Sequence, residues 1–370
     1  MIWLSSPHFS GQEHEYINPI LTANAQQSVS QNITDFEHEM ANFMGVKACA
    51  MLSSGTAALH LALILLGVEQ DDVVLCSSFT FSASANPIIY QHATPIFVDS
   101  EAQTWNICPE LLEKAIKKSI KSGKKPKAIV VVHLYGMPAK LKQLLKISQH
   151  YGIPIIEDAA ESLGSTYENQ HLGTFGTLGI VSFNVNKIIT TTGGGALVSN
   201  DENLIEKAKK LASQAREPTP HYQHTQIGYN YRMSNILAGI GRTQLKNIDE
   251  RVSQRRQIFE TYKTQLSDCQ NITFLNEPNN AFFSNRWLST IVLQDHIFRE
   301  ELRLDLLKNN IETRPLWKPM HLQPVFQNHP KETNGTSEKL FETGLCLPSS
   351  SFLTAMDLEK VTLCIRNFCR

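Results

Sequence analysis

Short apolar runs alternate with amphipathic stretches between about residues 36 and 200. The apolar runs predict strands at Ala48–Leu52, Val73–Cys76, Thr94–Val98, Ala128–His133, Ile153–Glu157 and Ile180–Asn184. Helical spacing of apolar residues predicts helices between several of them, at Thr56–Leu66, Pro109–Lys121 and Ala139–Tyr151. Strands that alternate with helices form crossover units, and such units build a mostly parallel sheet. We therefore expect an α/β domain that binds its ligands beyond the carboxyl ends of its strands.

A different pattern begins near residue 235. Asn235–Leu266 has helical spacing along its length, and we interpret it as the link between two domains. Further elements are expected at Trp287–Leu293 (strand), Phe298–Asn309 (helix) and Met356–Phe368 (helix), with a polar, loop-like stretch at Gln327–Ser337. These elements predict a smaller α+β domain. We place the large domain at residues 1–245 and the small domain at residues 246–370.

Composition and charge narrow the class of protein. The 370 residues include 34 basic and 35 acidic side chains, which argues against nucleic-acid and membrane-surface partners. The seven cysteines form no C-x-x-C pair, so neither a disulfide framework nor a metal site is indicated. The start of the sequence lacks signal-peptide features, and the longest apolar run, Ala57–Val68, is too short to span a bilayer. We expect a soluble cytoplasmic protein.

Three local motifs carry candidate chemistry, and the first is Ser53–Ala58, between a strand and a helix. Gly55 permits close backbone approach, and the amides of a helix N-terminus favour a phosphate. An ordinary helix cap is the competing interpretation.

The second motif places Asp158 at the end of a strand, where an acid can pair with a protonated ring nitrogen. Asp158 and Glu161 also resemble a capping box at the start of a helix, which is the structural alternative.

The third motif is Lys187, which stands between apolar flanks and before the run Gly193–Gly195. A partly desolvated lysine can form a Schiff base with a carbonyl. Taken alone, the glycine run could be a flexible turn. A phosphate cradle, a ring-nitrogen acid and a Schiff-base lysine, in this order along one α/β domain, together indicate pyridoxal 5′-phosphate (PLP).

The order and wording of these motifs resemble the DegT/StrS-type nucleotide-sugar aminotransferases. The similarity extends over most of the chain and includes Ser78–Phe81, His133–Gly136, Gly228–Asn235 and Cys346–Ser349. The resemblance implies the aspartate-aminotransferase architecture, PLP fold type I. Its large domain has a mostly parallel seven-stranded sheet, and its small C-terminal domain is α+β. It also implies a homodimer with shared active sites and pyridoxamine 5′-phosphate as the second cofactor form.

The resemblance also assigns roles to residues. It makes Lys187 the catalytic Schiff-base lysine, which later moves the proton, and Asp158 the partner of the ring nitrogen. The other cofactor contacts it implies are Phe81 over the ring, the phosphate ligands Gly55, Thr56 and Ser182, Glu161 near the ring hydroxyl, and Asn230 from the partner subunit. Arg232, Arg314 and His321 are the candidates for binding the nucleotide-sugar diphosphate.

Substrate identity rests on two segments. Asn186–Thr191 and Glu312–Lys318 look like the branch that aminates UDP-4-keto-6-deoxy-N-acetylglucosamine on the way to bacillosamine, and the family implies L-glutamate as the donor. A dTDP-4-keto-6-deoxyhexose or another keto nucleotide sugar is the alternative substrate. The segment Asn24–Gln31 departs from the family, because it lacks the usual aromatic residue and glycine near the substrate entrance.

Other classes of protein remain as alternatives. Related PLP-dependent sugar dehydratases carry histidine in place of the Schiff-base lysine, and Lys187 argues against that class. A non-catalytic sugar-binding homologue would be expected to lose Lys187 or Asp158, and both are present. An NAD-dependent Rossmann enzyme would carry G-x-G-x-x-G after the first strand, which this sequence lacks.

Overall fold

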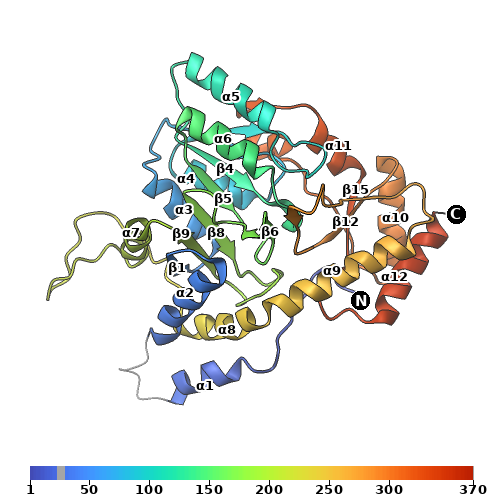
Figure 1. The fold of residues 1–370 in the computed structure, drawn as a ribbon, viewed down its shortest axis with the longest axis horizontal. Helices are drawn as coiled ribbons and strands as arrows, with labels where there is room; N and C mark the ends of the chain where they lie inside the picture. Colours follow the sequence, from blue (N-terminus) through green and yellow to red (C-terminus); the bar gives the residue numbers. More distant parts are fainter. Residues whose placement is uncertain (23–29, 370) are drawn as a thin grey trace.

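The computed structural model describes residues 1–22 and 30–369, and a large sheet lies at its centre (Figure 1). Within these ranges the sheet has eight strands in the order β1-β9-β8-β5-β4-β2-β3-β14. Their bounds are β1 Ala48–Leu52, β2 Val73–Ser77, β3 Thr94–Val98, β4 Ala128–Val132, β5 Ile155–Asp158, β8 Leu178–Ser182, β9 Gly195–Ser199 and β14 Lys331–Glu332. Six of these strands were predicted from the apolar runs, within two residues at each end. The α/β fold class is confirmed.

Two strands of this sheet were not predicted. β9 runs antiparallel to both neighbours, β1 and β8, whereas the other pairs in the sheet are parallel. β14 adds one strand beyond the expected seven. It lies within the stretch expected to be a loop, and it pairs with β3 because the amides of Phe97 and Asp99 donate to the carbonyls of Pro330 and Glu332.

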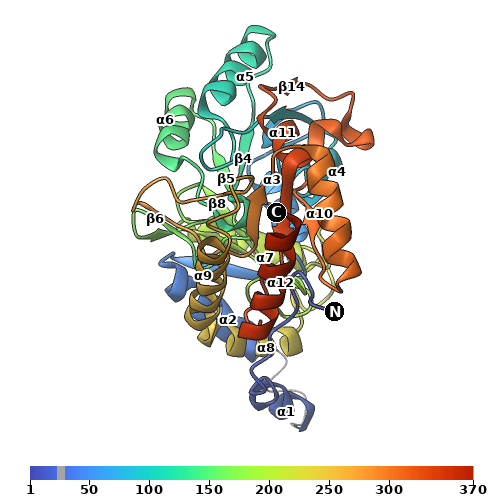
Figure 2. The same cartoon turned by 90° about the vertical axis from the view of Figure 1, so that its right-hand side faces the viewer.

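Helices cover both faces of the sheet (Figures 1 and 2). One face packs against α3 (Gly55–Leu65), α4 (Asn86–Tyr90) and α7 (Glu202–Ala212). The other packs against α2 (Gln31–Met44), α5 (Pro109–Lys121), α6 (Leu141–Tyr151) and α8 (Asn235–Lys246). Side chains alternate between the faces along β4, where Val130 points to the first core and Ile129 to the second. Double coverage explains why these strands are apolar throughout.

The C-terminal part forms a second core around a four-stranded sheet in the order β10-β12-β15-β13. Its strands are β10 Thr273–Phe274, β12 Ser289–Val292, β13 Arg314–Pro315 and β15 Gly344–Leu347, and its helices are α9 Ile248–Gln265, α10 His296–Lys308, α11 Thr336–Thr343 and α12 Ala355–Phe368.

The long helical segment expected from Asn235 is two helices, α8 and α9, which meet at Asn247. The domain division at residue 245 stays a prediction.

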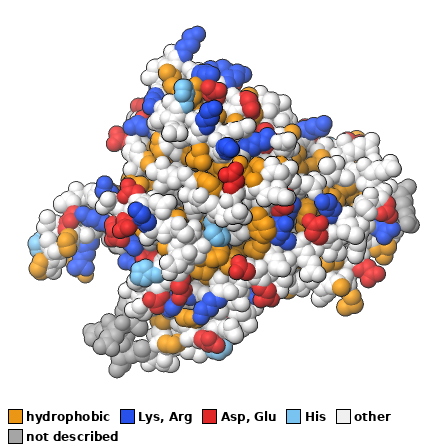
Figure 3. Space-filling view, in the orientation of Figure 1, with side chains coloured by type: hydrophobic (Ala, Val, Ile, Leu, Met, Phe, Trp, Pro, Cys, Tyr) orange, Lys and Arg blue, Asp and Glu red, His pale blue; other side chains and the backbone are white. Residues whose placement is uncertain are grey.

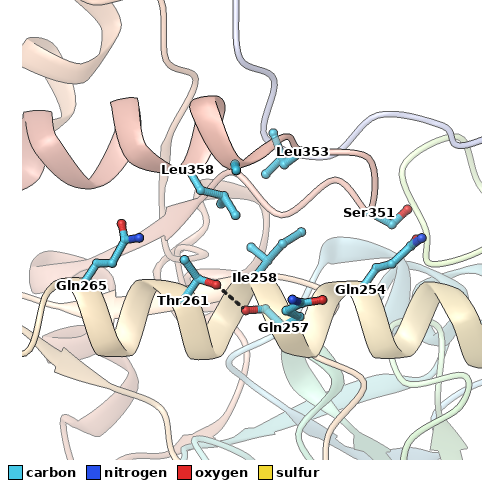
Figure 4. A pocket seen from close by; sticks show the side chains of 9 residues that line it. Gln254, Gln257, Ile258, Thr261, Gln265, Ser351, Leu353 and Leu358 are labelled. Carbon is cyan, nitrogen blue, oxygen red and sulfur yellow. Dashed lines mark hydrogen bonds between the residues drawn. The ribbon is translucent and has the colours of Figure 1, made fainter.

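The remaining elements are short. They are α1 His14–Thr22, the three-stranded sheet of β6 Thr166–Tyr167, β7 Gln170–His171 and β11 Phe282–Phe283, and 3-10 turns at Ser82–Ser84, Leu134–Gly136, Met320–Leu322 and Pro324–Phe326. A groove of about 260 Å³ runs between α9 and α12, and uncharged side chains such as Gln254 and Gln257 line it (Figure 4). Of the helices in the described ranges, none combines the length and apolarity that a membrane crossing needs.

Candidate active site

A cavity of about 790 Å³ lies at the carboxyl ends of the large sheet's strands. The strand ends contribute Ser53, Asp158 and Ser182, and the loop after β8 contributes Lys187. Trp287, Arg314 and Trp317 reach the cavity from the C-terminal part of the chain. This position is the one expected for a ligand site in an open α/β sheet.

The start of α3 forms one wall of the cavity. Ser54 caps the helix by accepting from the amide of Ala57 at 3.0 Å, so the capping interpretation holds for that residue. Gly55 and Thr56 line the cavity beside Ser182, and a Cβ on Gly55 would lie only 3.2 Å from the Cβ of Ser182. The exposed amides and the positive end of the helix dipole make this wall suited to a phosphate.

Asp158 lies at the end of β5 and is buried. Its Oδ2 accepts from the Ser84 hydroxyl at 2.6 Å, and its Oδ1 accepts from the Ala160 amide at 3.2 Å. Residues 159–165, all within the described part of the chain, form turns and no helix. The capping-box interpretation of Asp158 and Glu161 is therefore wrong, because the chain turns back toward β6 before a helical turn can form.

Glu161 is buried beside Lys187. Its Oε2 accepts from the Tyr135 amide at 2.7 Å, and its Oε1 lies 3.5 Å from Lys187 Nζ. Burial raises the pKa of Glu161 to about 7, although the nearby Lys187 ammonium opposes that shift. This carboxyl therefore exchanges its proton near neutral pH.

Lys187 extends from the loop after β8, and its side chain is 12% exposed. Its Nζ lies 4.2 Å from the centre of the Trp287 ring, a distance at which the ring face attracts an ammonium. The indole Nε1 of Trp287 donates to the Asn186 carbonyl at 2.8 Å, and the Ser5 hydroxyl donates to the same carbonyl. Residues from distant parts of the sequence thus hold the loop that carries the lysine.

Aromatic rings form another part of the cavity lining. Phe81 is 58% exposed, and its ring centre lies 5.5 Å from that of Trp317. The Trp317 amide donates to the Tyr135 hydroxyl at 3.0 Å, so this wall joins the C-terminal part to the loop after β4. Sequence reasoning missed Trp287, Trp317 and Ser84 as site residues. Trp317 lies within Glu312–Lys318 and Trp287 begins the predicted strand Trp287–Leu293, so both were in segments already singled out. Ser84 lies three residues after Phe81.

The structure separates the remaining candidates. Arg314 lines the cavity and pairs with Glu312 at 2.8 Å. Asn230 and Arg232 are exposed, and neither belongs to the cavity lining that the described residues define. His321 is buried outside that lining, with its ring nitrogens 2.6 Å from Ser78 Oγ and 3.0 Å from Glu338 Oε1. In this structure both nitrogens are occupied, so His321 is not available to a substrate. Residues 23–29, most of the atypical segment, lie outside the described residues.

The sequence is similar to a known protein family and to individual proteins of that family. A family model described as the DegT/DnrJ/EryC1/StrS aminotransferase family matches residues 8–366. The chain belongs to this family. A putative PLP-dependent aminotransferase, EpsN of Bacillus subtilis, is 51% identical over 97% of this chain and 94% of its own length. GDP-perosamine synthase of Escherichia coli O157:H7 is 37% identical over 93% of this chain and 92% of its own.

Solved structures agree with this placement. A DegT/DnrJ/EryC1/StrS aminotransferase from Brucella abortus superposes with a TM-score of 0.90 at 28% identity, covering 97% of this chain and 95% of that one. The chain is accordingly a PLP-dependent sugar aminotransferase with PLP fold type I. The residues present suit the cofactor: a Cβ on Gly55 would fill the space beside Ser182, Asp158 is a buried acid, and Lys187 is an amine on a side chain only 12% exposed in the same cavity.

Proposed function

We propose that this cavity transfers an amino group from L-glutamate to the keto carbon of a 4-keto-6-deoxy nucleotide sugar. One observation carries the proposal: Lys187, Asp158 and the start of α3 all line the same cavity, although they lie far apart in the sequence. That set combines an amine, an acid and a phosphate-binding helix end, which is what a PLP enzyme needs.

The proposal assigns each cofactor contact to a wall of the cavity. Gly55, Thr56 and Ser182 would hold the phosphate, Asp158 the ring nitrogen, Phe81 the ring face and Glu161 the ring hydroxyl. When bound, PLP supplies a reactive carbonyl and an electron-withdrawing ring that carries the amino group between the two substrates. The hydroxyl of Ser84 fixes the orientation of the Asp158 carboxylate, which therefore needs no rearrangement to meet a ligand.

Proton movement falls to Lys187 and its neighbours. The amine lies between the Trp287 ring and the Glu161 carboxyl, so its direction in the cavity is fixed. Because the pKa of Glu161 is about 7, that carboxyl can hold a proton or release one beside the amine at neutral pH. The Lys187 side chain is only 12% exposed, and the limited access of water to its amine favours transfer of its proton to a substrate carbon.

Two nucleotide sugars compete for the substrate assignment. The UDP-linked N-acetylhexosamine of the bacillosamine route is supported by Asn186–Thr191 and Glu312–Lys318, since members of both segments line the cavity. A GDP-linked 4-keto-6-deoxy sugar is the second candidate, and the 37% identity to a GDP-perosamine synthase favours it.

We also propose a homodimer with shared sites. The loop Arg216–Tyr229 projects from the molecule at the left of Figures 1 and 3. Asn230 directly follows this loop, and its side chain is exposed outside the cavity of its own chain. Tyr222 and Ile227 on this loop are 80% and 83% exposed. These two side chains offer apolar contact to a partner chain that would lie against the loop.

Substrate mass spectrometry tests the proposed function. Purified enzyme loaded with PLP is incubated with L-glutamate and, in separate reactions, with UDP-, GDP- and dTDP-linked 4-keto-6-deoxy sugars. We expect an amino sugar with the UDP-linked N-acetylhexosamine and no product with Lys187→Ala, whose circular dichroism stays that of the wild type. A product with the GDP sugar alone replaces the first candidate by the second. Absence of any amino sugar overturns the proposal.

A further inference from the structure

The C-terminal end of α12 runs beside the end of α9 and the turn that follows it (Figure 2). Two contacts fix how these segments are aligned. The Thr362 hydroxyl donates to Gln265 Oε1 at 2.6 Å, and Arg366 pairs with Asp268 at 3.2 Å. Figure 4 shows Gln265 near the end of α9, on the side that faces α12. Positions 362, 366 and 369 share one face when the chain is helical, and Cys369, the residue directly after α12, keeps helical backbone angles, so it is the next residue on that face to meet this turn.

The residue that Cys369 meets is Cys269. Cys269 follows Asp268, and its amide donates to the Leu266 carbonyl at the end of α9. The two thiols are near enough to influence each other's ionisation, and both side chains are half-buried against the same hydrophobic core of the C-terminal part. Burial and the neighbouring Cys269 thiol raise the pKa of Cys369 to about 12. Cys364, five residues earlier on α12, lies instead near Asp305 of α10.

We propose that Cys269 and Cys369 form a disulfide site that low-molecular-weight disulfides such as oxidised glutathione can close. One thiol, as thiolate, attacks the small disulfide, forms a mixed disulfide and releases one reduced thiol. The second thiolate then attacks the protein sulfur of that mixed disulfide and releases the other. Two electrons pass from the cysteine pair to the reagent, and the two protons end on the released thiols.

Closure would tie the last helix of the chain to the turn after α9. Because burial and the neighbouring Cys269 raise the pKa of Cys369, less of this thiol is ionised, and closure should be slower than exchange at an ordinary exposed thiol. The bond joins residues that are far apart in sequence, so it restrains the unfolded chain strongly. The oxidised form should therefore unfold at a higher temperature than the reduced form.

Peptide mapping of the full PLP-loaded enzyme tests this site. The enzyme is incubated with oxidised glutathione, excess reagent is removed, and the digest is analysed by mass spectrometry without reduction. We expect a linked pair of peptides containing Cys269 and Cys369, and five titratable thiols after unfolding in place of seven. Cys364→Ser is the matched control on the same helix and should still form the link, whereas Cys369→Ser should not.

Other results would overturn the proposal. These are glutathione adducts on Cys269 or Cys369 with no link between them, a link that requires Cys364, or a thiol count that stays at seven. A rise in Tm that oxidation causes, that reductant reverses and that Cys369→Ser lacks supports the same conclusion independently. Neither measurement depends on which sugar the enzyme accepts.

Discussion

Asp158 shows how much one side chain can decide at the scale of the residue. The structure holds its carboxylate with the Ser84 hydroxyl at 2.6 Å, at the floor of the cavity. Asp158→Asn keeps the shape and loses the charge, so it should retain PLP while turnover falls by about 10²–10³-fold, the usual size for a lost preorganised electrostatic contact. Absorbance of the bound cofactor and steady-state kinetics measure the two effects. Near-normal turnover would mean that the charge has no role in the reaction.

Glu161 gives a second prediction at this scale, through the pH dependence of stability. Its pKa is raised from 4.5 to about 7 by burial, so ionisation opposes folding. The loss of unfolding free energy caused by ionising Glu161 is absent below pH 4.5, grows as the pH rises and is complete above about pH 7. By this shift, Glu161→Gln should be more stable than wild type above pH 7, by on the order of 3 kcal/mol, and similar to it at low pH. Urea unfolding of the cofactor-free proteins measures this difference, and a gap that does not change with pH contradicts it.

At the scale of the element, the packing of β9 against the start of α3 depends on the close approach of the Gly195 backbone to the Gly55 backbone. A Cβ on Gly195 would lie 2.4 Å from the Gly55 amide nitrogen, so alanine there must push the start of α3 away from the strand. Gly195→Ala should cost about 1–3 kcal/mol of stability and weaken PLP binding. Gly193→Ala is the control, because among the described residues a Cβ there meets nothing within 4 Å. Thermal unfolding and PLP titration test the pair, and equal stability of the two variants contradicts the packing argument.

At the scale of the whole molecule, the proposed dimer can be tested by complementation. Lys187→Ala and Asn230→Asp chains should each be inactive, the second because its charge would repel the partner's cofactor phosphate. Mixed under subunit exchange, they should regain activity, since one of the two sites in each heterodimer then has both residues intact. A mixture that stays inactive after native mass spectrometry shows heterodimers would mean that Asn230 has no role in the partner's site.

The sequence by itself determined the features that depend on local pattern. Six strands of the large sheet follow from apolar runs, because a strand covered on both faces must be apolar along its length. The helix at Pro109–Lys121 follows from helical spacing and matches α5 at both ends. Asp158 and the Ser54 cap were found because they stand at or just after the end of a predicted strand, and Lys187 because it stands between apolar flanks before a glycine run. The domain boundary and the site roles are still predictions.

Only the tertiary structure decided the features that depend on contacts between distant segments. β14 is polar and two residues long, and β9 begins in a glycine run, so neither has a strand's pattern until a neighbour pairs with it. Packing of the C-terminal part against the sheet places Trp287 and Trp317 in the cavity lining. The same packing buries His321 outside that lining, against Glu338. The closeness of Cys269 and Cys369 has the same origin, because the packing of α12 against α9 brings both to one core. Periodicity reports the environment of a segment, whereas pairing, burial and pKa depend on which segments meet.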